Sequence, residues 1–407
     1  MKLFLHFCLG LLLVSCVNNK ESKGNEPKLT VEVVELQNPS EENSQLPRLF
    51  SNGKELYFSW VTRKDSMDVL NYAIYVNNEW YNETEITQGN DWFTNWADFP
   101  NIAENNGRIL TSYLQKSDSG TYTYDIKLNL YKPVSNGWIK DFILHKDGTK
   151  SEHGFVSIQP YAHNSFVVTW LDGRDTVGKE HGGGQMTLRA AIVFEDGTID
   201  YDTLLDERVC DCCNTALAIG PNDQIIVAYR DRSEDEIRDI SIVDWSMESN
   251  WSQPRTIGND NWKIAGCPVN GPAIDTFNHA TAVAWFTAAH EEGEVNVAFS
   301  NDGTKSFSEA IRIDAGNATG RVDILMLSET EAAVLWMEPK GDDEVIQLIR
   351  VNLDGTKSNP QTIAITSAER ASGFPQLEKV GNTLYVAWTV AGEGTSQIKM
   401  ASVDLPI

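Results

Sequence analysis

The feature that most constrains this chain is an internal repeat of two short strands joined by a Gly- or Asn-containing turn. The second strand of each copy ends near a Trp or Tyr. Copies recur at a spacing of roughly 50 to 60 residues, which is typical of four-stranded propeller blades and not of solenoid repeats. The seven copies are 46–61, 99–114, 156–171, 216–231, 272–287, 322–337 and 375–390.

Each copy is followed by segments that predict a third and a fourth strand, and no stretch shows sustained helical periodicity. The sequence therefore predicts an all-β fold, a β-propeller of seven four-stranded blades. The last copy has one further strand before the chain ends, so we expect the early strand at 29–36 to complete the final blade. Such closure removes an exposed sheet edge. Six blades, or a pair of β-sandwiches, are the alternatives.

The N-terminus has the pattern of an export signal. Residues 1–16 combine a basic Lys2, an apolar run and the sequence Leu13-Val14-Ser15-Cys16, which resembles a bacterial lipobox. We expect Cys16 to be lipidated, residues 17–28 to form a polar flexible tether, and residues 29–407 to form one propeller domain. The predicted location is the bacterial cell envelope, anchored to the outer membrane on its periplasmic face or at the cell surface. An ordinary signal peptide with a chance cysteine is the alternative.

The charge of the chain limits its partners. With 58 acidic and 33 basic residues the formal net charge is −25. This excess of acidic residues argues against nucleic-acid binding, because a protein of this charge does not neutralise a phosphate backbone. An acidic carbohydrate could bind only where a local basic pocket outweighs the negative electrostatic potential of the whole protein.

Four cysteines remain after export, and they fall at equivalent places in neighbouring repeats. Antiparallel strands place the loop before each first strand and the loop after each second strand at one end of a propeller, where ligands commonly bind. Aligned on the second-strand aromatic residue, Cys212 is in register with His153. The candidate ligands for Zn²⁺ or Cu⁺ are Cys210, Cys212, Cys213, Cys267 and His153. Disulfides among the four cysteines and a redox-active thiol are the other interpretations.

Charged and polar residues are predicted at the same end. The candidate catalytic residues Arg230, Asp231 and Arg232 follow a second strand and would suit a carboxylate or sulfate. A surface ion-pair network is the simpler interpretation of this cluster. The candidate ligand-binding residues are Asp172, Arg174, Trp96, Asn214 and Asn270.

One turn resembles a known motif. The segment from Ser300 to Phe307, SNDGTKSF, is similar to the Asp-box of the sialidase (neuraminidase) superfamily, with its Gly one place early. Together with the repeat and the Trp-ending strands, it makes residues 30–407 resemble that superfamily of propellers. Such boxes are structural, with an Asp capping a hairpin turn.

The resemblance implies a protein that binds an acidic glycan, or a glycosidase with an arginine triad, a Tyr-Glu pair and an acid/base Asp. Here Pro47-Arg48-Leu49 differs in order from the family's arginine motif, no Tyr-Glu pair is identified, and seven blades replace the family's six. We therefore expect a lipid-anchored exported propeller that binds an acidic glycan or a metal at the channel mouth. A glycoside hydrolase and a copper- or zinc-binding cysteine protein are the alternatives.

Overall fold

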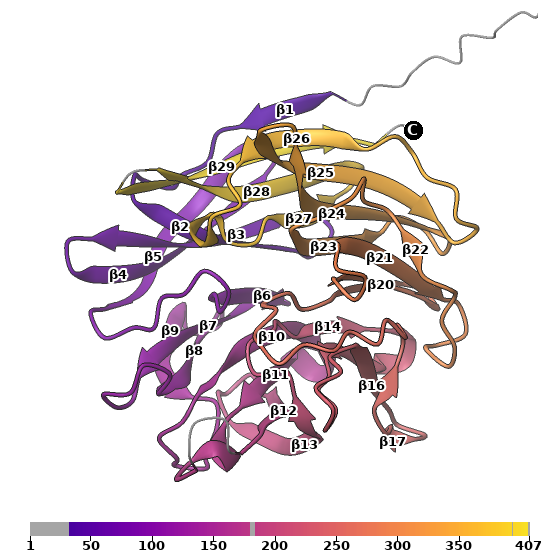
Figure 1. The fold of residues 1–407 in the computed structure, drawn as a ribbon. Coiled ribbons are helices and arrows are strands. Elements are labelled where there is room, and N and C mark those ends of the chain that lie inside the picture. Colours follow the sequence, from indigo (N-terminus) through magenta and orange to yellow (C-terminus); the bar gives the residue numbers. More distant parts are fainter. Residues whose placement is uncertain (1–31, 180–183, 393, 406–407) are drawn as a thin grey trace, which may run out of the picture.

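The predicted seven-bladed propeller is confirmed by the computed structural model, which describes residues 32–179, 184–392 and 394–405. Four antiparallel strands form each blade, and the innermost strands of successive blades lie next to one another around a central channel (Figure 1). Six blades and a pair of sandwiches are both excluded. The predicted signal (1–16) and tether (17–28) lie outside the described residues, and within those residues no helix has the length and apolarity needed to cross a bilayer.

The first three blades follow the chain in order. Their strands are β2 (Ser44–Ser51), β3 (Leu56–Lys64), β4 (Met67–Val76) and β5 (Glu79–Gly89); β6 (Asn101–Asn105), β7 (Arg108–Lys116), β8 (Tyr124–Lys132) and β9 (Gly137–Ile143); and β10 (His153–Tyr161), β11 (Ser165–Asp172), β12 (Met186–Val193) and β13 (Ile199–Val209).

In the fourth blade the outer strand is split into two short pieces that both pair with the third strand. The strands of blades four to six are β14 (Ala216–Ile219), β15 (Ile225–Arg230), β16 (Ile240–Ser246), β17 (Asn250–Trp251) and β18 (Arg255–Thr256); β19 (Ala273–Phe277), β20 (Ala280–Thr287), β21 (Glu294–Ser300) and β22 (Ile311–Arg312); and β23 (Gly320–Met326), β24 (Glu331–Lys340), β25 (Asp343–Asn352) and β26 (Gln361–Thr366). Short 3₁₀ turns occur at Ala162–Asn164, Arg174–Thr176, Pro221–Asp223 and Arg370–Ser372.

The seventh blade is completed by the N-terminal strand, as the spare strand in the sequence predicted. It comprises β27 (Gln376–Val380), β28 (Thr383–Gly392), β29 (Thr395–Asp404) and β1 (Val33–Leu36). The antiparallel register pairs Val33 with Val403 and Leu36 with Met400. Figure 1 shows β1 at the outer edge of this blade, near the C-terminal end of the chain. The last sheet is therefore closed by both ends of the described chain.

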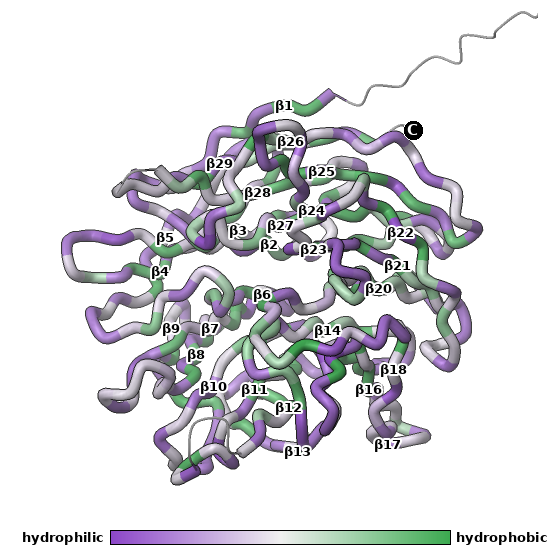
Figure 2. The backbone as a smooth tube through the Cα atoms, in the orientation of Figure 1, coloured by the Kyte–Doolittle hydropathy of each residue, from purple (hydrophilic) through white to green (hydrophobic). Residues whose placement is uncertain are grey.

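The repeated aromatic residue of each second strand is buried, and in the third and sixth blades its polar atom forms a hydrogen bond within the blade. Trp170 Nε1 donates to Asp172 at 2.9 Å, and Trp336 Nε1 donates to Glu338 at 2.9 Å. Figure 2 shows hydrophobic positions along the strands and hydrophilic ones in the connecting loops. Burial of a large ring with a bonded N–H is what makes Trp useful at this position.

The Asp-box-like turn joins β21 to β22 and has the structural role that its sequence predicts. Asp302 accepts hydrogen bonds from the Ser306 backbone N–H at 3.1 Å and from the Ser300 hydroxyl at 2.9 Å. Gly303 has a φ of 71°, a left-handed conformation that Gly adopts without a Cβ clash. Because β21 ends here, the turn lies at the end of the propeller opposite the cysteines.

Candidate functional site

One end of the propeller gathers the residues that the sequence singled out. Here the loops preceding β10, β14 and β19 meet the ends of β11 and β15. Cys210 directly follows β13, Cys212 and Cys213 precede β14, and Cys267 lies in the loop before β19. We call this end, with these loops, the cysteine rim.

The cysteines of the fourth blade form a compact sulfur cluster. The Sγ atoms of Cys210, Cys212 and Cys213 all lie within 4.8 Å of one another, and Cys210 Sγ is 4.0 Å from Cys212 Sγ. Cys267 comes from the next inter-blade loop and is near enough to Cys212 for that thiol to lower the pKa of Cys267. All four are free thiols. Cys210 and Cys213 are buried, whereas Cys267 is exposed, so the cluster opens to solvent on one side.

Backbone contacts hold the two cysteine-bearing loops together. The Cys210 N–H donates to the carbonyl of Arg230 at 3.0 Å, which fixes the loop to the end of β15. A Cβ on Gly271 would lie 2.0 Å from the carbonyl oxygen of Asn214. Only Gly therefore allows the Cys267 loop to approach the Cys212 loop this closely.

The four thiols of the cluster differ in the direction in which their surroundings shift the pKa. Burial alone would raise the pKa of Cys210, but hydrogen bonds from Cys212 and Cys213 and the charge of Arg238 hold that pKa well below its usual value. Arg238 Nη1 lies 3.4 Å from Cys210 Sγ. The neighbouring Cys212 thiol also lowers the pKa of Cys267, whereas burial raises that of Cys213. Thiolates, the form that binds metals, are thus favoured at two of the four positions.

The predicted catalytic group divides into a buried and a more accessible part. Arg230 is 1% exposed and donates to the carbonyls of Asn270, Arg238 and Phe286 at 2.6 to 2.8 Å. Arg232, which is less deeply buried, pairs with Asp211 at 3.0 Å and Glu236 at 2.7 Å. Burial raises the pKa of Asp231 to about 6, with a hydrogen bond from Ser241 opposing the shift. Arg230 therefore acts here as a cross-link between loops.

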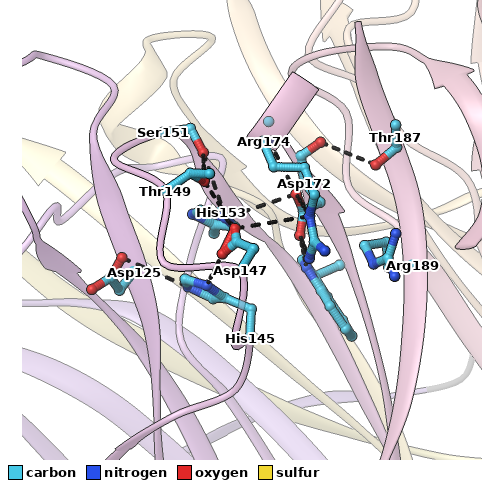
Figure 3. A network of polar contacts seen from close by, with 12 residues as sticks. Asp125, His145, Asp147, Thr149, Ser151, His153, Asp172, Arg174, Thr187 and Arg189 are labelled. Carbon is cyan, nitrogen blue, oxygen red and sulfur yellow. Dashed lines mark hydrogen bonds and ion pairs between the residues drawn. The ribbon is translucent and has the colours of Figure 1, made fainter. Parts of the chain in front are cut away.

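Asp172, Arg174 and His153 lie at the same rim but are not part of the sulfur cluster. Arg174 Nε donates to Asp172 at 2.8 Å, and His153 Nε2 is 3.7 Å from the Asp172 carboxylate and 3.0 Å from that of Asp147 (Figure 3). The sequence register placed His153 at the correct end of the molecule. Its side chain, however, joins a separate His-Asp cluster at the junction of the second and third blades.

The remaining predicted ligand-binding residues surround the channel mouth. Trp96 stacks on Phe374 with ring centres 5.9 Å apart, and the guanidinium of Arg321 lies 4.8 Å from the Trp96 ring centre. Asn214 donates to the carbonyl of Ala97 at 2.7 Å, and the side-chain oxygen of Asn270 accepts from the Arg321 N–H at 2.7 Å. Asn270 thus links the neighbouring fifth and sixth blades, whereas Asn214 links the loop before the fourth blade to the loop before the second.

A third group, Tyr124, Glu152 and Asp98, was missed by the sequence reasoning. The Tyr124 hydroxyl contacts Glu152 Oε1 at 2.7 Å and Asp98 Oδ2 at 3.2 Å. Burial raises the pKa of Glu152 to about 8 and that of Asp98 to about 7. Cys267 adds to the shift at Glu152, which places this carboxyl within electrostatic range of the sulfur cluster. The sequence signal that could have found them is position, because Asp98 and Glu152 lie just before first strands, within three residues of the strand, as Cys213 does.

The central channel behind the rim contains a cavity of about 110 Å³ lined by residues of the innermost strands. Polar side chains of this lining form hydrogen bonds with the main chain of the neighbouring blade. Asn101 donates to the Val156 carbonyl at 2.7 Å, and Asp323 accepts from the Leu377 N–H at 2.8 Å. Burial, together with the charges of Asp323 and Asp275, raises the pKa of Glu378 to about 8. The channel lining therefore joins the blades while holding protonated carboxyl groups near neutral pH.

Known structures share this fold at low sequence identity. An ulvan lyase of polysaccharide lyase family PL25, solved with a -[GlcA(1-4)Rha3S]- ligand, has a TM-score of 0.58 at 12% identity, covering 91% of this chain and 96% of its own. A protein of unknown function from Dyadobacter fermentans gives 0.52 at 10% identity, covering 92% and 98%. The phage phi92 endosialidase gives 0.51 at 9% identity, covering 93% and 69%. These likenesses establish the fold.

No protein-family model and no curated protein matches the sequence. The function of the chain must therefore be argued from its own site.

Proposed function

We propose that this protein is a lipid-anchored exported propeller that binds a thiophilic metal ion, Zn²⁺ or Cu⁺, through Cys210, Cys212, Cys213 and Cys267. The observation that carries the proposal is the gathering of sulfur atoms at one point of the rim. Two sulfurs about 2.3 Å from a tetrahedral zinc ion lie about 3.8 Å apart. The 4.0 Å between Cys210 and Cys212 is close to this value and about twice the length of a disulfide bond.

The surrounding charges suit a thiolate centre. Four thiolates around one divalent ion carry a net charge of −2, which is costly to bury without compensation. Arg238 contacts Cys210, and the charge of Arg230 acts on Cys213. Two buried guanidinium groups therefore supply the opposite charge on the protein side of the cluster.

Metal analysis of the protein tests this proposal. Full-length protein purified with a thiol reductant and without chelator should contain about one zinc or copper ion per chain. Cys212→Ser and Cys267→Ser should each lower the metal content or weaken binding at least about tenfold, because each removes a first-sphere ligand. Met247→Leu, which alters an exposed sulfur outside the rim, is the matched control. Metal content that is unaffected by either Cys variant would refute the assignment.

The anchor is part of the same proposal and rests on the Leu13-Val14-Ser15-Cys16 sequence. Cys16→Ser should move the protein from the membrane fraction to the soluble fraction of expressing cells. Unchanged membrane association in that variant would argue against lipidation at Cys16.

A carbohydrate-active role is the second candidate, favoured by the Tyr124, Glu152 and Asp98 group. The two carboxyl groups contact one hydroxyl and so lie within about 6 Å of each other, the range found in retaining glycoside hydrolases. A carboxyl with a pKa of about 8 is protonated at neutral pH, as a general acid requires. The fold is shared with an ulvan lyase and an endosialidase, which act on acidic glycans.

Turnover on acidic oligosaccharides tests this second role. Glucuronic acid- and sialic acid-containing oligosaccharides are the probes, and Glu152→Gln should lower any turnover at least about 100-fold, since it removes the proton donor. Glu248→Gln, an exposed change outside the rim, should retain activity. Absence of turnover by the wild type, or full activity in Glu152→Gln, would leave metal binding as the sole function proposed.

A further inference from the structure

A second group of metal-ligand side chains lies at the junction of the second and third blades, separate from the sulfur cluster (Figure 3). Asp125 comes from β8, His145 and Asp147 from the loop between β9 and β10, and His153 from the start of β10. Ligand atoms of Asp125, His145 and His153 all lie within 4.8 Å of one another. His145 is 6% exposed and His153 is 0% exposed, so these imidazoles are removed from bulk water.

Asp147 determines which imidazole nitrogens are free. Its two carboxylate oxygens lie 2.9 Å from His145 Nδ1 and 3.0 Å from His153 Nε2. In the tautomers in which both nitrogens donate protons to Asp147, the lone pairs reside on His145 Nε2 and His153 Nδ1. A carboxylate that fixes the tautomer in this way is the usual outer partner of a metal-binding histidine.

The freed nitrogen of His145 has no hydrogen-bond partner although it is buried. It faces Asp125 Oδ1 across 3.7 Å, which is too long for a hydrogen bond. A nitrogen and an oxygen that bind one tetrahedral zinc ion, each at about 2.1 Å, are about 3.4 Å apart. His153 Nδ1 lies 3.3 Å from the backbone carbonyl of Tyr124, a contact in which Nδ1–H donates in the alternative tautomer and which metal coordination would replace. The separation of His145 Nε2 from Asp125 leaves room for an ion between two electron-pair donors.

The charges of the cluster also call for a cation. Arg174 donates two hydrogen bonds to Asp172 and also lies 3.8 Å from Asp147, so the cluster has this one guanidinium for three carboxylates when Asp125 is included. The imidazole rings of His145 and His153 are stacked at 3.6 Å with only 6° between their planes. A divalent ion held between the imidazoles and Asp125 would balance the excess of carboxylate charge.

We propose that His145 Nε2, His153 Nδ1 and the Asp125 carboxylate bind a divalent transition-metal ion of the zinc type, with the Tyr124 carbonyl as fourth ligand. Asp147 orients both imidazoles from outside the first coordination sphere. An ion lies in the plane of the imidazole that binds it, so one ring must turn out of the stack on binding. The site is of the nitrogen and oxygen type and is distinct in chemistry from the sulfur cluster.

The absorption spectrum of bound Co²⁺ distinguishes the two sites. Co²⁺ bound by cysteine sulfur has a charge-transfer band in the near ultraviolet, whereas Co²⁺ bound only by nitrogen and oxygen lacks this band. The probe is Co²⁺ added to the full-length protein in which all four rim cysteines are replaced by Ser. We expect one Co²⁺ per chain with visible d–d absorption and no charge-transfer band. His145→Ala in this background should abolish binding, and Asp147→Asn should weaken it by about 10- to 100-fold. His279→Ala, an exposed histidine elsewhere, should bind as the parent does.

Several outcomes would overturn the proposal: no Co²⁺ bound by the folded cysteine-free protein, or equal binding after His145→Ala. If the cysteine-free chain does not fold, titration of the cysteine-containing protein replaces it. There, two Co²⁺ ions are expected, and His145→Ala should remove the one without charge transfer. If the cysteine-containing protein binds a single Co²⁺ ion and its d–d spectrum is the same after His145→Ala, the His-Asp cluster binds no metal and the proposal is wrong. The charge-transfer band depends on the cysteines alone, so failure at one site is distinguishable from failure at the other.

Discussion

At the scale of single residues, the buried Arg230 holds three separate segments together by donating to three main-chain carbonyls. The end of its strand predicted its place at the rim, but two of the carbonyls belong to loops and the third, of Phe286, belongs to β20, 56 residues away. No local pattern reveals such partners. The same limit applies to His153: its register gave the correct end of the propeller, whereas the side chain of Asp147, six residues earlier, determines the cluster that it joins.

Replacement of Arg230 distinguishes a cross-linking residue from a catalytic one. Arg230→Ala should lower the free energy of unfolding by about 3 kcal/mol or more, because it leaves three buried carbonyls without donors. Arg232→Ala is the matched control, and the loss of its partly exposed ion pairs should cost about 1 kcal/mol or less. Urea denaturation of both variants measures the difference. Equal stability of the two variants would contradict the structural role of Arg230.

At the scale of elements, most of the fold was predictable from the sequence. The repeated aromatic residue, the turn between the two strands and the spare N-terminal strand together fixed the blade number and the closure. What could not be predicted depends on contacts between blades. Tyr124 is on the third strand of its blade, Glu152 precedes the next blade and Asp98 precedes its own, so their meeting follows only from the packed ring.

Removal of β1 tests the closure of the seventh blade. A chain starting after Leu36 loses the pairing of Val33 and Leu36 with β29. It also loses the packing of Val33 against the sixth and seventh blades and of Leu36 against the first and seventh. We expect the melting temperature to fall by several degrees and the protein to self-associate, since β29 then has an unpaired edge. A chain starting at residue 29 keeps β1 and is the control. Thermal unfolding and light scattering provide the readouts, and identical behaviour of the two chains would show that β1 does not close the ring.

At the scale of the whole molecule, the ring concentrates titratable groups in its channel despite the strongly negative net charge. Asp275, Asp323 and Glu378 face the same channel, and burial raises the pKa of each, to about 7, 6 and 8 respectively. Their protonated forms are therefore favoured by folding. This contribution to stability is fully present below the unfolded pKa values and is lost as the pH rises through the folded ones.

Glu378→Gln should make stability less dependent on pH. Between about pH 5 and pH 8 the folded protein keeps a proton on Glu378 that the unfolded chain has released, so wild-type stability falls with rising pH. The variant should reduce that slope by up to about 1.4 kcal/mol per pH unit, the value for one proton, with less where channel water solvates the carboxylate. Urea midpoints measured across this range provide the test. Glu248→Gln is the exposed control, and equal slopes in all three proteins would contradict the assignment.

We propose that the propeller brings four cysteines from two inter-blade loops together to bind one metal ion. X-ray absorption at the metal edge, on reduced protein of known metal content, tests this proposal. We expect about one zinc or copper ion per chain with three or four sulfur ligands at about 2.3 Å. Metal-free protein with its four cysteines in disulfides, or a metal without sulfur ligands, would contradict it.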